Sequence, residues 1–255
     1  SIDLVARRGA IQANGLTYRG VIADDGGIVI LTVANNLGDV GDNNRLPDAL
    51  YRPPLSSPDS PWRYISVDQS GTPIGCVAAY LSKNGEHIVW HRDLSTPEFA
   101  FYNTRTNSRS SVSLSQVVGG GRLRSIQLKG ISDNGRYILF IADVMDPSSS
   151  YWSRRVYWYD RDGDDNGVFD DVITPGRAFT DIQHTNPDRL PMVQALMSND
   201  GQSIGITVQD SVPELTVYHV PSGRSYSIST GSRDPYFYYL KSMELIIYTY
   251  THPNG

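Results

Sequence analysis

The residues best suited to chemistry form one acidic loop, residues 160–171, with the sequence DRDGDDNGVFDD. Its central part, 162–170, fits the pattern D-x-D-x-N-G-x-x-D. Calcium takes about six to eight oxygen ligands, and side chains at alternate positions of such a loop can point toward one ion. Gly167 permits the sharp turn that the loop needs. The pattern predicts a calcium site whose five ligands are Asp162, Asp164, Asn166, the Val168 carbonyl and Asp170.

An acidic turn exposed to solvent is the alternative to this metal site. Six aspartates in twelve positions would repel one another without a cation, which favours the metal. The loop differs from an EF-hand, because the twelfth position counted from Asp162 is Ile173 and not glutamate. A second acidic loop, 39–48, has irregular spacing and contains Arg45. The sequence leaves open whether that loop binds a second calcium ion or is a polar hairpin loop.

The one motif that suggests catalysis lacks the structural context that it needs. Residues 201–205, GQSIG, match the G-x-S-x-G pattern, but a nucleophile elbow needs a strand, a tight turn and then a helix. Here Gly201 belongs to an expected hairpin turn and Ser203 to the strand that follows. Carboxylates in a central channel would favour an enzyme, but the sequence cannot place them. We therefore expect no catalytic residues and no enzyme activity in this chain.

A short repeated motif predicts the elements that position the loop. An apolar residue, Ser or Ala, any residue, Asp or Asn, and Gly recur at 22–26, 81–85, 131–135 and 197–201, with a degenerate copy at 239–243. Asn-Gly and Asp-Gly supply the positive φ angles of a tight hairpin turn, and an apolar run follows each copy. Each copy therefore marks the hairpin between the first and second strands of one unit.

Two more strands follow each hairpin, so each unit has the four strands of a propeller blade. We predict an all-β chain with almost no helix: a β-propeller of four-stranded antiparallel blades in a single domain, 1–255, or part of one. The expected blades are 19–66, 74–116, 124–182 and 193–229, with a partial blade formed by 236–251 together with 1–8. The number of blades stays open between a five-bladed ring and a fragment of a six- to eight-bladed one.

These motifs carry a resemblance to known families. Residues 131–140, ISDNGRYILF, are similar to the TolB-type repeat of bacterial propellers, and the loop 162–170 resembles the nine-residue calcium loops of integrin-type blades. The resemblance implies a bacterial propeller that is secreted, cell-surface or periplasmic, where millimolar calcium suits such a loop. It implies little about function, because one fold hosts many functions.

Composition narrows the choice of partner. The net charge is −5 and no basic patch appears, so we expect no nucleic acid. No apolar run approaches the roughly 18 residues of a membrane span.

The single cysteine, Cys76, lies in an apolar run and is expected to be buried and inert. The chain opens at Ser1 without a signal peptide, which fits a mature form or a fragment.

Three functions remain in competition at this stage. The first is a non-catalytic extracellular scaffold or interaction module, which binds a protein partner or assembles with itself and could also bind a glycan. The second is a glycan-active enzyme, or the propeller of an oligopeptidase whose catalytic domain lies outside this chain. The third is a periplasmic TolB-like module that binds a protein partner. The lack of a catalytic motif, together with the expected blades and calcium loop, favours the first function. The specific partner and the oligomeric state stay open.

Overall fold

The computed structural model describes residues 7–8, 11–42, 44–54, 61–92, 97–180, 182–184, 192–209, 214–229, 235–239 and 245–249. Within these ranges the structure is almost entirely strand and turn. One helical turn, α1 (Leu114–Val117), follows the last strand of the second sheet. No helix in the described ranges has the length and apolar character needed to cross a membrane.

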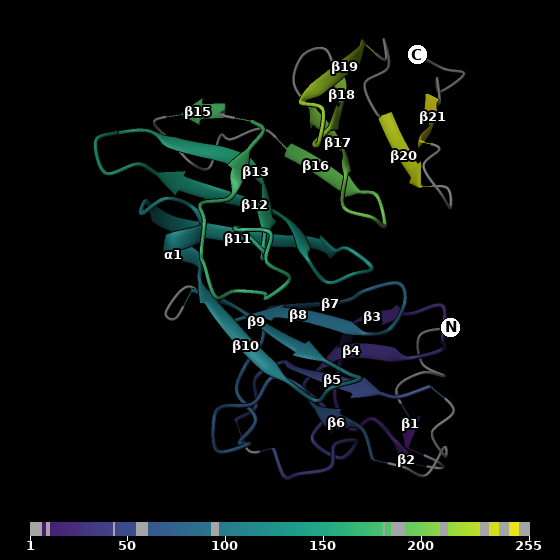
Figure 1. Cartoon of the computed structure of the whole chain (residues 1–255). Helices are drawn as coiled ribbons and strands as arrows, with labels where there is room; N and C mark the ends of the chain where they lie inside the picture. The colour runs from purple at the N-terminus through teal and green to yellow at the C-terminus, as the bar shows by residue number, and fades with distance from the viewer. Residues whose placement is uncertain are drawn as a thin grey trace.

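Four antiparallel sheets follow one another along the chain (Figure 1), and each runs in sequence order from its first to its last strand. The strands of the first sheet are β3 (Thr17–Ile22), β4 (Ile28–Thr32), β5 (Asp48–Arg52) and β6 (Arg63–Tyr64). The strands of the second are β7 (Ala78–Leu81), β8 (His87–His91), β9 (Glu98–Asn103) and β10 (Arg109–Ser113).

The third sheet is longer because its first three strands extend to nine or ten residues. Its strands are β11 (Arg122–Ile131), β12 (Tyr137–Met145), β13 (Trp152–Asp160) and β14 (Arg177–Ala178), with β15 (Ile182–His184) also paired to β13. The strands of the fourth sheet are β16 (Met192–Met197), β17 (Ser203–Gln209), β18 (Glu214–His219) and β19 (Arg224–Ser229).

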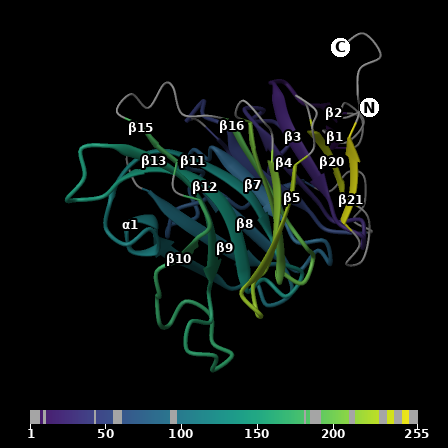
Figure 2. The ribbon, with the colours of Figure 1, turned by 90° about the horizontal axis from the view of Figure 1, so that it is seen from above.

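Three apolar cores join neighbouring sheets face to face. Sheets one and two share a core around Val29, Trp90 and Tyr102. Sheets two and three share a larger one around Phe99 and Phe140, whose rings meet edge to face with centroids 5.0 Å apart. Sheets three and four share a smaller one around Ile141 and Ile204. The sheets follow one another along an arc in chain order in Figure 1, and Figure 2 shows the same sheets from above, where they overlap. β11 contacts the first strands of both neighbouring sheets, β7 and β16. Four-stranded sheets that pack face to face around their first strands define a β-propeller, so the predicted fold is confirmed.

The repeated motif has a physical explanation in the turns. Gly26, Gly85, Gly135 and Gly201 all have positive φ, between 75° and 88°, and each lies in the hairpin between the first and second strands of its sheet. In the third sheet, the hydroxyl of Ser132 donates to the Asn134 side chain and accepts the backbone N–H of Tyr137. The second and fourth sheets repeat both bonds. The Ser and the Asx residue therefore close the turn that the glycine permits.

The same turns connect one blade to the next. The backbone N–H of Asp24 donates to the carbonyl of Lys83, and Asp133 donates in the same way to Asn199. Between the second and third sheets the Lys83 N–H donates to the carboxylate of Asp133 instead. Each of the last three turn glycines also faces a side chain of the preceding blade, in the space that a Cβ would need: Asp25 at Gly85, His87 at Gly135 and Tyr137 at Gly201.

The two ends of the chain form separate strand pairs. β1 (Arg7–Arg8) pairs with β2 (Ile11–Gln12), and β20 (Pro235–Tyr239) pairs with β21 (Leu245–Thr249) across the degenerate fifth copy of the motif. The expected strand within 1–8 lies mostly outside the described residues, and β1, its described part, pairs with β2. Completion of a fifth blade by the N-terminal strand stays a prediction.

Candidate functional site

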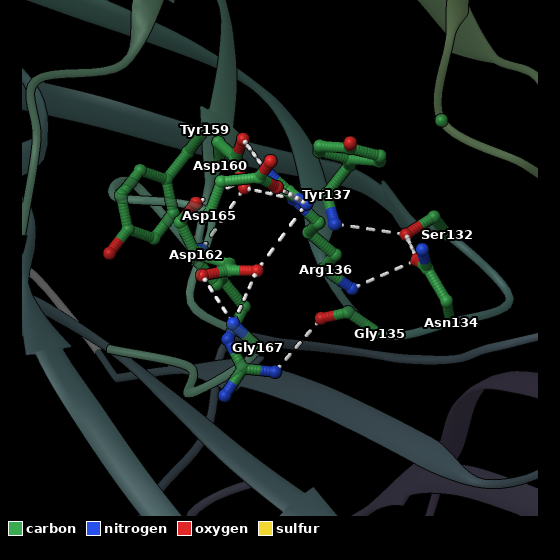
Figure 3. A network of polar contacts seen from close by, with 12 residues as sticks. Ser132, Asn134, Gly135, Arg136, Tyr137, Tyr159, Asp160, Asp162, Asp165 and Gly167 are labelled. Atoms are coloured by element: carbon green, nitrogen blue, oxygen red, sulfur yellow. Dashed lines mark hydrogen bonds and ion pairs between the residues drawn. The ribbon is translucent and has the colours of Figure 1, made fainter. Parts of the chain in front are cut away.

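The acidic loop begins where β13 ends and is organised by an arginine of the neighbouring hairpin (Figure 3). Arg136 follows the turn glycine of the third sheet. Its guanidinium pairs with both carboxylate oxygens of Asp160, with Nε–Oδ1 and Nη2–Oδ2 distances of 2.7 and 2.8 Å. The Nη1 atom lies 2.7 Å from a carboxylate oxygen of Asp165 and 3.3 Å from one of Asp162. The hydrogen bonds with Asp160 raise the pKa of Arg136 above its usual range, so this cation is permanent.

A second arginine fixes the far end of the loop. Arg161 is 5% exposed, and its guanidinium pairs with the Asp170 carboxylate, whose side chain is 3% exposed. The same guanidinium donates to the Gly135 carbonyl and to the Ser110 hydroxyl, and it lies 3.6 Å from the ring centre of Phe101. Because Ser110 and Phe101 belong to the second blade, this ion pair connects the loop to that blade.

The structure places the five predicted calcium ligands in one loop, but the side chains of Asp162, Asp164, Asn166 and Asp170 already make hydrogen bonds or ion pairs within the protein. The Asp162 carboxylate accepts the backbone N–H of Gly167 and contacts Arg136. The Asn166 amide group donates to Asp164, and its oxygen accepts the N–H of Val168. Asp170 is paired with Arg161.

This arrangement fits a calcium ion poorly. Two of the expected ligands, Asp162 and Asp170, already neutralise arginines, and Asp170 lies in a buried contact with the second blade. Among the described residues, no group of three or more His, Cys, Asp or Glu side chains is placed to hold a metal ion. Calcium binding at 162–170 therefore stays a prediction that requires the loop to rearrange.

The second acidic loop, 39–48, is held by hydrogen bonds within the same chain. Asp48 is 1% exposed and accepts the hydroxyl of Ser66 and the amide of Asn44. Burial, followed by the nearby charge of Asp42, raises the pKa of Asp48 to about 7. The buried hydroxyl of Tyr64 has no hydrogen-bond partner among the described residues. Asn43 of the same loop lies outside the described residues, and calcium binding by this loop stays an open alternative.

A cavity of about 660 Å³ lies among the first strands of the blades. Arg19 comes from β3, Tyr80 from β7, Gln127 and Lys129 from β11, and residues 192–196 from β16; Ile141 and Arg154 of the third blade complete the lining. Basic and amide groups therefore share this space with apolar ones. The sequence analysis considered carboxylates in a central channel, whereas each of these lining residues is basic, amide, tyrosine or apolar.

The sequence analysis missed this cavity although a signal for it was present. The strands before the four turn glycines read TYRGVI, AAYL, RLRSIQLKGI and MVQALM, with four basic residues and no acidic one. The whole chain has 27 acidic and 22 basic residues, so the bias stands out once the repeats are aligned. Two of these four basic residues, Arg19 and Lys129, line the cavity, and the net charge of the whole chain conceals this bias.

Solved structures show where this architecture recurs. No protein-family model matches the chain, and no curated protein sequence matches it. The chain is similar to the β-propeller domain of the trilobed protease from Pyrococcus furiosus at 9% identity and a TM-score of 0.52; the match covers 93% of this chain and 69% of that domain. It is also similar to an acylaminoacyl peptidase from Pyrococcus horikoshii, at 11% identity and a TM-score of 0.52, where the match covers 92% of this chain and 35% of the peptidase.

A prolyl endopeptidase gives a third match, at 10% identity and a TM-score of 0.52, with 89% of this chain and 31% of that chain covered. The chain thus spans about a third of the length of the two peptidases. At these identities the likeness shows the fold, and the protein belongs to the β-propeller class. The TolB-type likeness stays a prediction.

These similarities correct one expectation. The sequence analysis expected no enzyme, because it found no catalytic motif in the blades. The three propellers with a TM-score of 0.52 all belong to a protease or a peptidase, so this fold gives no reason to exclude an enzyme. The absence of a catalytic motif in the blades was therefore too narrow a basis for that expectation.

Proposed function

We propose that this chain is the propeller, or part of the propeller, of a peptidase-type protein, and that it binds extended polypeptide in the cavity among its first strands. The observation that carries the proposal is the cavity itself, because its volume of about 660 Å³ lies within the usual range for ligand sites. The likeness to propellers of a protease and two peptidases supports the choice of polypeptide as the ligand.

The lining suits a peptide backbone. Gln127 and Gln194 each offer an amide donor and an amide acceptor, which match the N–H and C=O groups of an extended chain. Ile141, Met192 and Leu196 add apolar surface for side chains. A site that combines a few polar groups with apolar walls has the make-up of a ligand pocket, in which the polar groups fix the orientation of the ligand.

The test fills the cavity with a bulky side chain. Gln194→Trp should abolish binding of fluorescein-labelled neutral peptides with amidated ends, measured by fluorescence anisotropy. Tyr226→Trp is the matched control, because Tyr226 lies on the outer strand β19 and is 62% exposed. Binding that is absent in the wild type, or equal in both variants, would refute the cavity as a peptide site.

The peptidase part has its own test. The complete natural protein should cleave a labelled peptide panel, and the Gln194→Trp substitution should raise KM for extended substrates more than it changes kcat. Complete protein that binds these peptides but cleaves none would exclude the peptidase assignment and leave the peptide site standing.

A further inference from the structure

Arg19 is a cation without a carboxylate partner in the described part of the structure. Its guanidinium lies 4.1 Å from the ring centre of Tyr80, on the first strand of the next blade. This cation–π contact fixes the guanidinium but leaves its N–H donors available. Arginine donors in a fixed position match the two oxygens of a carboxylate.

Lys129 brings a second cation to the same cavity from β11. Burial, and then the charge of Arg19, lowers the pKa of its ammonium group. No ion pair of Lys129 occurs among the described residues, although the chain as a whole is acidic. Two cations that face one cavity repel each other, and an anion between them would relieve the repulsion.

The third cation of the lining is already neutralised. Arg154 donates from Nε and Nη2 to the two carboxylate oxygens of Asp143, at 2.7 and 2.8 Å, and Ser125 donates to the same carboxylate at 2.6 Å. Asp143 is 3% exposed and is committed to these partners. Arg19 and Lys129 therefore remain as the groups that an incoming anion would meet.

The neighbouring side chains select the kind of anion. Apolar groups of Ile141, Met192 and Leu196 line the same cavity, which favours a ligand with an apolar body over a strongly hydrated inorganic ion. We propose that this cavity binds the carboxylate of a peptide, with Arg19 and Lys129 as its two cationic contacts. The inference deepens the proposed function, on which it rests, by naming the chemical group that the site takes.

A peptide carboxylate has two sources, the C-terminus and an acidic side chain. Three N-acetylated tetrapeptides separate them: tetra-alanine with a free C-terminal carboxylate, tetra-alanine with an amidated C-terminus, and an amidated peptide of three alanines followed by glutamate. Each is titrated by calorimetry at about 0.15 M salt, where exposed charges are largely screened. Inorganic phosphate serves as a fourth probe.

At least one carboxylate probe should bind about tenfold more tightly than the neutral amide, and whichever binds more tightly identifies the source. Arg19→Gln and Lys129→Gln should each remove this preference. Arg224→Gln, which changes the net charge equally but lies on the outer strand β19, should keep it. Lys129→Arg should also keep the preference, and it should keep it to higher pH than the wild type, because burial lowers the pKa of the Lys129 ammonium group.

Several results would overturn the carboxylate site. They are equal affinity for carboxylate and amide probes, a preference that survives both glutamine variants, or phosphate binding as tight as the best peptide. If every peptide binds weakly and the Gln194→Trp substitution does not change that binding, the proposed function is refuted instead. If Arg19→Gln fails to fold, as judged by circular dichroism, Lys129→Gln and Lys129→Arg still decide the matter.

Discussion

Arg136 and Arg161 show how single residues attach an acidic loop to the blades around it. Each contacts aspartates of the loop, and Arg161 also reaches the second blade through Ser110. The loop sequence alone suggested that only a metal could offset so much negative charge. Two arginines, one of them 26 residues before the acidic segment Asp162–Asp170, offset part of it, and sequence spacing could not reveal that contact.

Calcium binding can be tested directly against this arrangement. We propose that residues 162–170 bind calcium. Calorimetric titration with calcium chloride should then give a binding isotherm that Asp162→Ala and Asp164→Ala abolish. Because Asp170 must leave Arg161 to reach an ion, Arg161→Gln should raise the calcium affinity several-fold. Affinity that Asp164→Ala leaves unchanged would refute the five-ligand site.

Asp48 should make the stability depend on pH. The folded-state pKa of about 7 lies above the unfolded value of 3.8, so the folded protein binds the proton more tightly. The stabilisation from this proton is full below pH 3.8 and is lost as the pH rises toward 7. Asp48→Asn should flatten that part of the profile, by roughly 1–3 kcal/mol in the free energy of unfolding between pH 4 and 7. Urea titrations at several pH values measure it, and identical slopes in both proteins would contradict the prediction.

At the scale of elements, the hairpin turn was the most predictable part. Its Ser, Asx and Gly residues act within a few positions of one another, so the sequence carries the whole mechanism. The cavity lining comes from strands far apart in the chain and becomes visible only after folding. Arg19 and Tyr80 are 61 positions apart, yet they stack.

The turn glycines offer a matched pair of substitutions. Gly26 and Gly135 occupy the same motif position with φ of 88° and 75°, but a Cβ at Gly26 meets nothing within 4 Å, whereas one at Gly135 meets the His87 ring. Gly26→Ala should cost about 1–2 kcal/mol for the left-handed backbone alone. Gly135→Ala should cost roughly 1–3 kcal/mol more for the crowding at His87. Chemical denaturation of both variants measures this, and equal losses would show that the contact between blades carries no energy.

For the whole molecule, the shared cores imply that neighbouring blades unfold together. Phe140 is fully buried and packs against Phe99 of the second blade. Phe140→Ala should lower the free energy of unfolding by about 3–5 kcal/mol and speed hydrogen exchange in both β8 and β12. Tyr226→Ala, on an exposed outer position, should change it by about 0.5 kcal/mol or less. Faster exchange confined to β12 would mean that the blades unfold independently.

The side chains that fill the space at the turn glycines differ from blade to blade: a carboxylate at Gly85, an imidazole at Gly135 and a phenol ring at Gly201. Exchanging the second and third blades would bring Asp25 to Gly135 and Tyr137 to Gly85, where each meets a space shaped by another group. Similar repeats in one chain risk docking in the wrong order as they fold. Divergence at these few positions gives each blade its own neighbour, and so guards the order of assembly while the sheets themselves stay alike.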